Sequence, residues 1–130
     1  MKFNAMIPEL TVTNLEQTKD FYLNQLGFVL ECEREADKFI FLSYGESQFM
    51  FEQVHDERWS VADLVYPFGR GVNFSIIAPN VSELYQNVQA AHIKRYRPLQ
   101  EVTYQCEGQD IVEVQFLIQA PDGYLLRFTN

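Results

Sequence analysis

The chain has 130 residues, of which 47% are apolar, and this is enough for one compact domain with its own core. Its formal net charge of −8 argues against nucleic acids and anionic membranes as partners, because their phosphates recruit Lys and Arg. The charge allows a cationic ligand, although solubility alone would also explain it.

Its apolar runs are too short to span a bilayer, and its first residues lack the long apolar stretch of a signal peptide. We therefore expect a cytoplasmic protein. The two cysteines, Cys32 and Cys106, do not imply a disulfide framework, and reduced thiols are expected in that compartment.

The first half of the chain predicts a strand, a helix and three further strands. Residues 3–12 alternate between apolar and polar side chains, which is typical of a strand. Asn14 is a favourable N-cap for a helix whose apolar residues recur at helical spacing until Gly27 ends it. Residues 28–34 predict the next strand. The last two strands are predicted as a hairpin that turns at residues 44–47, with arms at 38–43 and 47–54.

The second half predicts the same succession of elements. Residues 71–78 read as a strand, and Asn80 caps a helix whose apolar stripe runs to Ala91. A strand follows at residues 101–106. The sequence Pro-Asp-Gly at 121–123 then forms the turn of a hairpin with arms at 110–120 and 124–129.

The two halves form an internal repeat. Residues 7–15 and 73–81 show the same strand followed by a capping Asn, with an offset of 66 positions. We therefore predict an α+β fold in which two repeated βαβββ modules form a curved mixed sheet around a cup, with the ligand between the copies. The prediction is a single domain over 1–130, with module one at about 1–56, a junction loop at about 55–70 and module two at about 71–130.

Each predicted sheet has an apolar face for its helix and a mixed face opposite. Pro8, Leu10 and Val12 belong to the apolar face of the first strand, and Glu9 and Thr11 to the other. The mixed faces are rich in Glu, Gln, Asn, Ser and Arg. Such a face is either open to water, as in many antiparallel sheets, or lines a polar cavity.

Three stretches together show a family likeness: residues 7–15, residues 21–28 (Phe-Tyr-Leu-Asn-Gln-Leu-Gly-Phe) and residues 120–128 (Ala-Pro-Asp-Gly-Tyr-Leu-Leu-Arg-Phe). The chain resembles the vicinal oxygen chelate superfamily, which includes glyoxalase I, extradiol dioxygenases, and fosfomycin- and bleomycin-resistance proteins. A likeness of this kind identifies a fold and leaves the activity open.

Enzymes of this superfamily bind a divalent metal in the cup, and the resemblance places the four ligand positions at Ile7, Met50, Asn73 and Arg127. Ile and Met side chains do not supply the ligands that such metals prefer, and Arg127 brings a permanent positive charge. A register error of one residue would introduce a glutamate but no complete ligand set. We therefore predict no catalytic residue, metal ligand or cofactor, and we interpret His55 and His92 as surface histidines.

The likeness is greatest to the bleomycin-resistance branch, at residues 49–52 and 121–127. It implies a non-catalytic homodimer that sequesters a cationic glycopeptide-type antibiotic, such as a bleomycin-like ligand, in an acidic, aromatic-lined cup. The predicted ligand-binding residues are Glu9, Met50, Glu52, Trp59, Tyr66, Phe68, Asn73, Glu113 and Arg127.

Alternatives stay open for parts of this set. Arg127 would instead neutralise Glu52 or Glu113, because a buried charge needs a partner. The junction aromatics would instead pack as a lid or form a dimer contact. For the whole chain, the alternatives are a metal-dependent enzyme of the glyoxalase or dioxygenase type and a binder of an unrelated metabolite.

Overall fold

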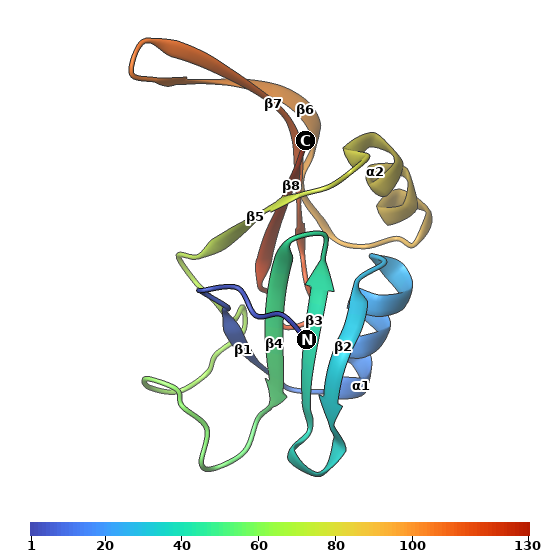
Figure 1. Cartoon of the computed structure of the whole chain (residues 1–130), viewed down its shortest axis with the longest axis vertical. Helices are drawn as coiled ribbons and strands as arrows, with labels where there is room; N and C mark the ends of the chain where they lie inside the picture. Colours follow the sequence, from blue (N-terminus) through green and yellow to red (C-terminus); the bar gives the residue numbers. More distant parts are fainter. The chain divides into compact units, whose positions relative to one another are not determined.

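The computed structural model describes every residue from Met1 to Asn130, and it contains the same strand topology twice (Figure 1). One four-stranded sheet has the order β1-β4-β3-β2, and the other has the order β5-β8-β7-β6. The sheets belong to two compact units, residues 1–68 and 69–130. The α+β class and the two similar modules are confirmed, and the unit boundary falls inside the predicted junction loop. A cup shared by both modules, and a single domain, stay predictions.

In the first unit, the outer strand β1 runs parallel to β4, and β4 and β3 and then β3 and β2 pair antiparallel. The helix α1 is prolonged by a π-helical segment, and a short 3₁₀ turn joins β2 to β3. The bounds are β1 Glu9–Val12, α1 Leu15–Lys19, the π-helical segment Asp20–Gln25, β2 Val29–Arg34, the 3₁₀ turn Glu35–Asp37, β3 Phe39–Tyr44 and β4 Ser47–Gln53.

The second unit repeats this arrangement. The strand β5 runs parallel to β8, and β8 and β7 and then β7 and β6 pair antiparallel. The bounds are β5 Asn73–Ile77, α2 Val81–Ala90, β6 Arg95–Cys106, β7 Gln109–Gln119 and β8 Leu125–Thr129. Neither helix of the chain is long and apolar enough to cross a membrane.

The predicted helix caps are confirmed in both units. The Oδ1 atom of Asn14 accepts a hydrogen bond from the Gln17 N–H at 3.0 Å. The Oδ1 atom of Asn80 accepts one from the Glu83 N–H at 3.1 Å. Each bond satisfies a backbone donor that the first turn of a helix leaves unpaired. The repeat seen in the sequence is therefore a repeat of local hydrogen bonding.

The first predicted strand is shorter than expected, because its first residues bind to side chains. Strand β1 begins at Glu9, although the alternation starts at residue 3. The Asn4 N–H donates to Gln48 Oε1 at 2.7 Å, and Gln48 Nε2 donates to the Lys2 carbonyl at 2.9 Å. These bonds hold residues 2–4 against β4 without a backbone ladder.

Strand β6 is longer than predicted. It begins at Arg95 and includes Pro98, which has no N–H to donate to a neighbouring strand. Proline is tolerated because β6 is an edge strand, and its register against β7 shifts between Arg95 and Arg97 and again before Gln100. Only the part from residue 101 shows an uninterrupted strand pattern in the sequence.

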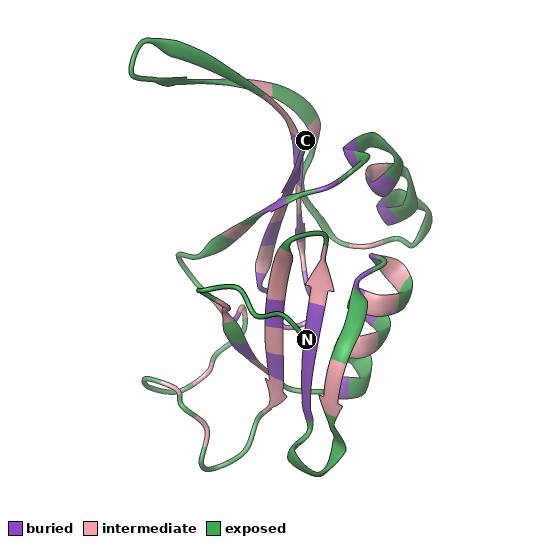
Figure 2. Ribbon diagram, in the orientation of Figure 1, coloured by how far each residue is buried: buried purple, intermediate pink, exposed green.

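The core of each unit lies between its helix and one face of its sheet, as the alternation predicted (Figure 2). Phe51 and Phe128 occupy corresponding places on β4 and β8, and neither exposes any surface. Val72 precedes β5 and is half exposed, although the alternation of residues 71–78 would place it on the apolar face with Phe74 and Ile76. The other fully buried strand residues are Ile40, Phe41, Leu42, Ile76, Phe116, Ile118 and Leu126.

Candidate ligand-binding site

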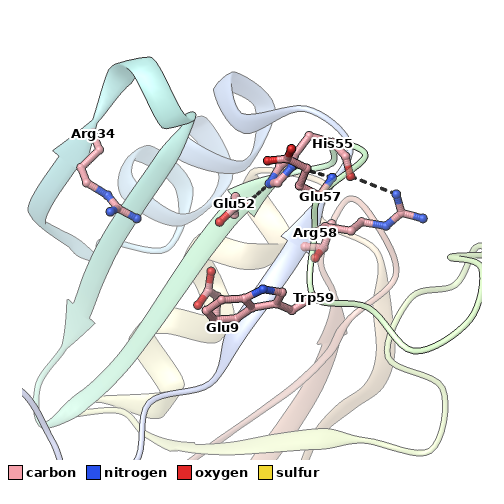
Figure 3. Close-up of a pocket in the computed structure, with 8 residues that line it drawn as sticks. Glu9, Arg34, Glu52, His55, Glu57, Arg58 and Trp59 are labelled. Atoms are coloured by element: carbon pink, nitrogen blue, oxygen red, sulfur yellow. Dashed lines mark hydrogen bonds and ion pairs between the residues drawn. The ribbon is translucent and has the colours of Figure 1, made fainter.

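A cavity of about 490 Å³ lies in the first unit (Figure 3). Its volume is within the range of small-molecule sites, which is about 300–1,000 Å³. It is bordered by strands β1 and β4, by the end of β2 and by the loop that follows β4. The lining residues are Glu9, Thr11, Arg34, Glu52, His55, Glu57, Arg58 and Trp59.

Parallel pairing of β1 with β4 brings the carboxyl groups of Glu9 and Glu52 together. Glu9 lies opposite Met50, and Thr11 lies opposite Glu52, so the two glutamates are diagonal neighbours on one face of the sheet. Phe51, between Met50 and Glu52, points to the opposite face and is buried in the core. Glu9 and Glu52 are far apart in the sequence, and the pairing of β1 with β4 is what brings them together.

The two carboxyl groups interact directly. Burial, the negative charge of Glu52 and a hydrogen bond with Glu52 all raise the pKa of Glu9, whereas the charge of Arg34 acts in the opposite direction. Glu9 still has an exposed side chain, so solvent screens these effects. A cation bound beside both groups would reduce the repulsion between the carboxylates.

His55 extends this acidic pair. Its Nε2 atom contacts Glu52 Oε1, and its Nδ1 atom accepts a hydrogen bond from the Glu57 N–H at 3.1 Å. Because Nδ1 is the acceptor, the geometry assigns the hydrogen of the neutral ring to Nε2, which donates to the carboxylate. His55 is exposed, as predicted, but the prediction did not include its contact with Glu52.

The two arginines of the cavity are engaged by other groups. Arg34 Nε lies 3.6 Å from Asp37 Oδ2, and its guanidinium carbon lies 4.2 Å from the centre of the Phe39 ring. Arg58 Nη1 donates to the His55 carbonyl at 3.0 Å. Figure 3 shows Arg34 across the cavity from the other charged side chains. These contacts hold the guanidinium groups at the border of the cavity, where the charge of Arg34 still acts on Glu9.

Trp59 is the aromatic side chain that lines the cavity. It is 96% exposed, so its ring is accessible for stacking against a ligand. The other predicted aromatics, Tyr66 and Phe68, are not among the lining residues. Tyr66 is half exposed elsewhere in the loop, and Phe68 is buried. The sequence could not distinguish them, because all three lie in an irregular segment without periodicity.

Met50 lies beside the cavity on β4, half-buried between the positions of Glu9 and Phe41. Phe41 is buried on this face of the sheet, where the ring of Phe3 stacks on it with centroids 5.0 Å apart. Residues 39–42, Phe-Ile-Phe-Leu, form an unbroken apolar run. A run of this kind is typical of a strand buried on both faces, although the prediction of the site did not draw on it.

Three predicted residues belong to the second unit. Asn73 is exposed at the start of β5. Arg127 Nη1 lies 3.9 Å from Glu113 Oε2, and the two side chains are each 27% exposed. Arg127 was predicted either to bind the ligand or to neutralise Glu52 or Glu113. The structure contains the ion pair with Glu113. Among the nine predicted residues, only Glu9, Glu52 and Trp59 line the same cavity.

The residues do not fit the divalent metal that the fold family implies. Arg127 and Met50 occupy corresponding positions, opposite Ser75 and Glu9 respectively, and neither supplies a metal ligand. No group of three or more His, Cys, Asp and Glu side chains that could hold a metal ion is present. We therefore derive no chemical step through a metal.

Five lining residues, Thr11 of β1 and four charged or titratable side chains, were not predicted from the sequence as ligand contacts. His55, Glu57 and Arg58 follow β4 directly in a charged run, and this proximity to Glu52 was the available indication. Arg34 comes from β2, which is separated from β4 by β3, so only the sheet order shows that its long side chain reaches the cavity.

Comparison with known proteins identifies the fold. No protein-family model and no curated protein matches the chain. The structure of TioX from Micromonospora sp. ML1 is similar, with 21% identity over 98% of both chains and a TM-score of 0.76. A glyoxalase/bleomycin resistance protein/dioxygenase from Alicyclobacillus acidocaldarius shows 23% identity over 97% of this chain and 89% of that one, with a TM-score of 0.67.

A third similar structure is an integron cassette protein from the mobile metagenome of V. cholerae. It is 21% identical over 99% of this chain and 96% of that chain, with a TM-score of 0.70. The chain has the glyoxalase/bleomycin resistance protein/dioxygenase fold. The resemblance seen in the sequence motifs is thereby confirmed at the level of the fold, which by itself assigns no activity.

Proposed function

We propose that the protein is a non-catalytic small-molecule binder that holds a cationic ligand in the cavity of its first unit. The observation that carries this proposal is that Glu9 and Glu52, diagonal neighbours on one sheet face, line one cavity with the exposed ring of Trp59. Carboxylates attract the charge of the ligand, and the indole ring offers a surface for an aromatic or cationic group.

The energetics support recognition of a ligand with both a positive charge and a flat ring. Stacking on Trp59 or a cation–π contact would contribute about 1–2 kcal/mol. A cation close to Glu9 and Glu52 would gain further from both carboxylates, because the cavity is less polar than water. Together these terms favour a cationic, partly aromatic molecule over a neutral or anionic one.

Within this class, we propose a cationic glycopeptide-type antibiotic such as bleomycin as the ligand, and a cytoplasmic homodimer as the working form. The similarity of residues 49–52 and 121–127 to bleomycin-resistance proteins supports this choice. The acidic balance of the first unit supports it as well. This unit contains twelve acidic residues and only five basic ones.

The chain offers a direct measurement, because Trp59 is its only tryptophan. We expect bleomycin to change the fluorescence of Trp59 saturably at micromolar concentrations, with matching heat in calorimetry. The double variant E9Q/E52Q should bind at least about tenfold more weakly, since each lost charge interaction contributes about 1 kcal/mol. The variant S75A, at the position of the second unit that corresponds to Glu9, is the matched control and should bind like the wild type.

Two results would count against the proposal in different ways. If a simple polyamine binds and bleomycin does not, the cation site stands and the antibiotic is the wrong ligand. If E9Q/E52Q binds bleomycin as tightly as S75A does, the cavity is not the site.

A further inference from the structure

Residues 1–6, here called the strap, cross the mixed face of the first sheet before β1 begins (Figure 1). The ring of Phe3 stacks on the ring of Phe41 in β3, with their centroids 5.0 Å apart and an angle of 21° between the ring planes. Phe3 is 55% exposed, whereas Phe41 is 1% exposed. The strap is therefore the outer layer at this point of the face, and Phe41 lies beneath it.

The position that Phe3 occupies is next to the cavity of the first unit. Phe41 lies opposite Met50 in the pairing of β3 with β4, and Met50 lies opposite Glu9 in the pairing of β4 with β1. Neighbouring strands are about 4.8 Å apart, so about 10 Å separates Phe41 from Glu9 across the sheet. A drug-sized molecule spans that distance, so a ligand held by Glu9 and Glu52 can place a ring at Phe41.

The strap is held loosely on the sheet. It forms no backbone ladder with β4, and its hydrogen bonds involve side chains. The Asn4 N–H donates to Gln48 Oε1 at 2.7 Å, and Gln48 Nε2 donates to the Lys2 carbonyl at 2.9 Å. Asn4 Nδ2 donates to the Glu46 carbonyl. All six residues of the strap are exposed. Exposed hydrogen bonds and few buried contacts are typical of a segment that opens locally while the rest of the structure stays folded.

The strap itself has the chemistry proposed for the ligand. Lys2 and Phe3 place a positive charge next to a flat ring. Lys2 lines a second hollow of the first unit, of about 530 Å³, which Glu31 and Glu46 also line. The strap therefore combines a cation in an acidic hollow with a ring stacked on an aromatic side chain. These are the two kinds of contact that a cationic, partly aromatic ligand would make.

We propose that the strap is an internal competitor of the ligand. Phe3 occupies the place on Phe41 that a flat ring of the ligand takes, and binding of the ligand displaces the strap. This inference rests on the proposed function, and it adds Phe41 to Trp59 as a ring-binding position. The apparent affinity for a ring-bearing cation is then the intrinsic affinity multiplied by the fraction of molecules in which the strap is open. A cation without a ring does not need Phe41, so its affinity should not depend on the strap.

The test measures the affinity of the full chain for two probes by the fluorescence of Trp59 and by calorimetry. Bleomycin carries positive charge and flat rings, whereas spermidine carries positive charge without a ring. The variant F3A removes the competing ring, and Q48A removes two of the hydrogen bonds that hold the strap. The control M6A removes a strap side chain that is 83% exposed and leaves the stacked rings in place.

We expect F3A to bind bleomycin more tightly than the wild type does, by about tenfold if the open strap is populated to about 10%. Q48A should bind it more tightly by a smaller factor, because Phe3 can still return to Phe41. Adding F41L to F3A should cancel the gain, because the ligand then loses the ring on which it stacks. M6A should bind like the wild type, and the affinity for spermidine should stay within about twofold in every variant. Circular dichroism should show that all variants are folded.

The methionines of the chain report the position of the strap directly. Met6 belongs to the strap and Met50 lies beside Phe41. In NMR spectra of protein with labelled methionine methyl groups, bleomycin should move the Met6 signal toward its position in ligand-free F3A and should also shift the Met50 signal. Spermidine should leave the Met6 signal in place.

The outcomes separate this inference from the proposed function. If the wild type binds bleomycin through Glu9 and Glu52 but F3A binds it no more tightly than M6A does, the strap is not a competitor. A Met6 signal that does not respond to bleomycin leads to the same conclusion. Weaker binding by F3A would make Phe3 a ligand contact and would also overturn the inference. If neither probe binds to any variant, the proposed function fails and the inference fails with it.

Discussion

The two units of this protein share a backbone plan and differ in their chemistry. Both have the same strand order and the same Asn cap before the helix. The first unit has twelve acidic and five basic residues, whereas the second has six and five. The helix-facing side of each sheet must stay apolar to form a core, but the opposite face carries no such constraint. Duplication therefore preserved the frame and left one face of each copy free to diverge.

The divergence is visible at corresponding positions. Glu9 lies opposite Met50 in the first unit, and Ser75 lies opposite Arg127 in the second. The first unit uses its acids to line a cavity, whereas Arg127 of the second pairs with Glu113. The same register thus supports a candidate binding site in one copy and an internal ion pair in the other.

The largest expected effect compares the two cores. Phe51→Ala and Phe128→Ala each remove a ring that is fully buried, and each should lower the free energy of unfolding by about 3–5 kcal/mol. Chemical denaturation followed by circular dichroism measures both losses. If one variant loses less than about 1 kcal/mol, the two cores are not energetically equivalent.

The acidic pair of the first unit should make cation binding depend on pH. Because the pKa of Glu9 is raised, Glu9 takes up a proton in mildly acidic solution, and a cation must then displace it. For a ligand of fixed charge, we expect affinity to fall at least about twofold between pH 7 and pH 4.5, because a raised pKa leaves Glu9 at least half protonated at the lower pH. Calorimetry measures the trend, and E9Q should flatten it. An unchanged slope in E9Q would exclude Glu9 as its origin.

In the second unit, removing only Glu113 of the Glu113–Arg127 ion pair should reduce the stability of the protein more than removing both partners. Glu113→Gln leaves the partly buried charge of Arg127 without its partner and should cost about 1–2 kcal/mol. The double variant E113Q/R127M, which gives this position the residue found at Met50, should cost less than the single one. Thermal and urea unfolding compare them, and a larger loss in the double variant would contradict this account.

The paired helix caps offer a smaller and more symmetrical comparison. Asn14→Ala and Asn80→Ala each remove one hydrogen bond to the first turn of a helix, and each should cost about 1 kcal/mol. Replacement by Asp or Ser, which also accept this bond, should restore most of the loss. Equal stability of the Ala and Asp variants would show that the caps contribute nothing.

The smallest expected effect is the change in the free energy of unfolding when Glu9 is replaced. A raised pKa means that the folded state binds this proton more readily than the unfolded state does. The resulting stabilisation is complete below the unfolded pKa of Glu9 and is lost as pH rises through the folded one. Glu9→Gln should therefore stabilise the protein at pH 7, by less than about 1 kcal/mol because the side chain is exposed. A loss of stability at pH 7 would contradict the direction of this shift.

Local physics made much of the fold predictable from the sequence. The alternation of residues 49–52, the caps at Asn14 and Asn80, and the Pro-Asp-Gly turn at 121–123 each depend on neighbours in the chain. These features were enough to predict two copies of one module. The extra length of β6 was missed, because Pro98 breaks the local pattern and only the edge position of the strand makes it acceptable.

The candidate site depended on information that no local pattern contains. The sequence by itself determined that Glu9 and Glu52 lie on polar faces of their strands and that Trp59 follows in an irregular loop. Only the tertiary structure decided that these three meet in one cavity with Arg34 and His55, while Phe68 is buried. The physical reason is that parallel pairing of β1 with β4 and the order of the strands join distant segments, whereas alternation and capping act between neighbours.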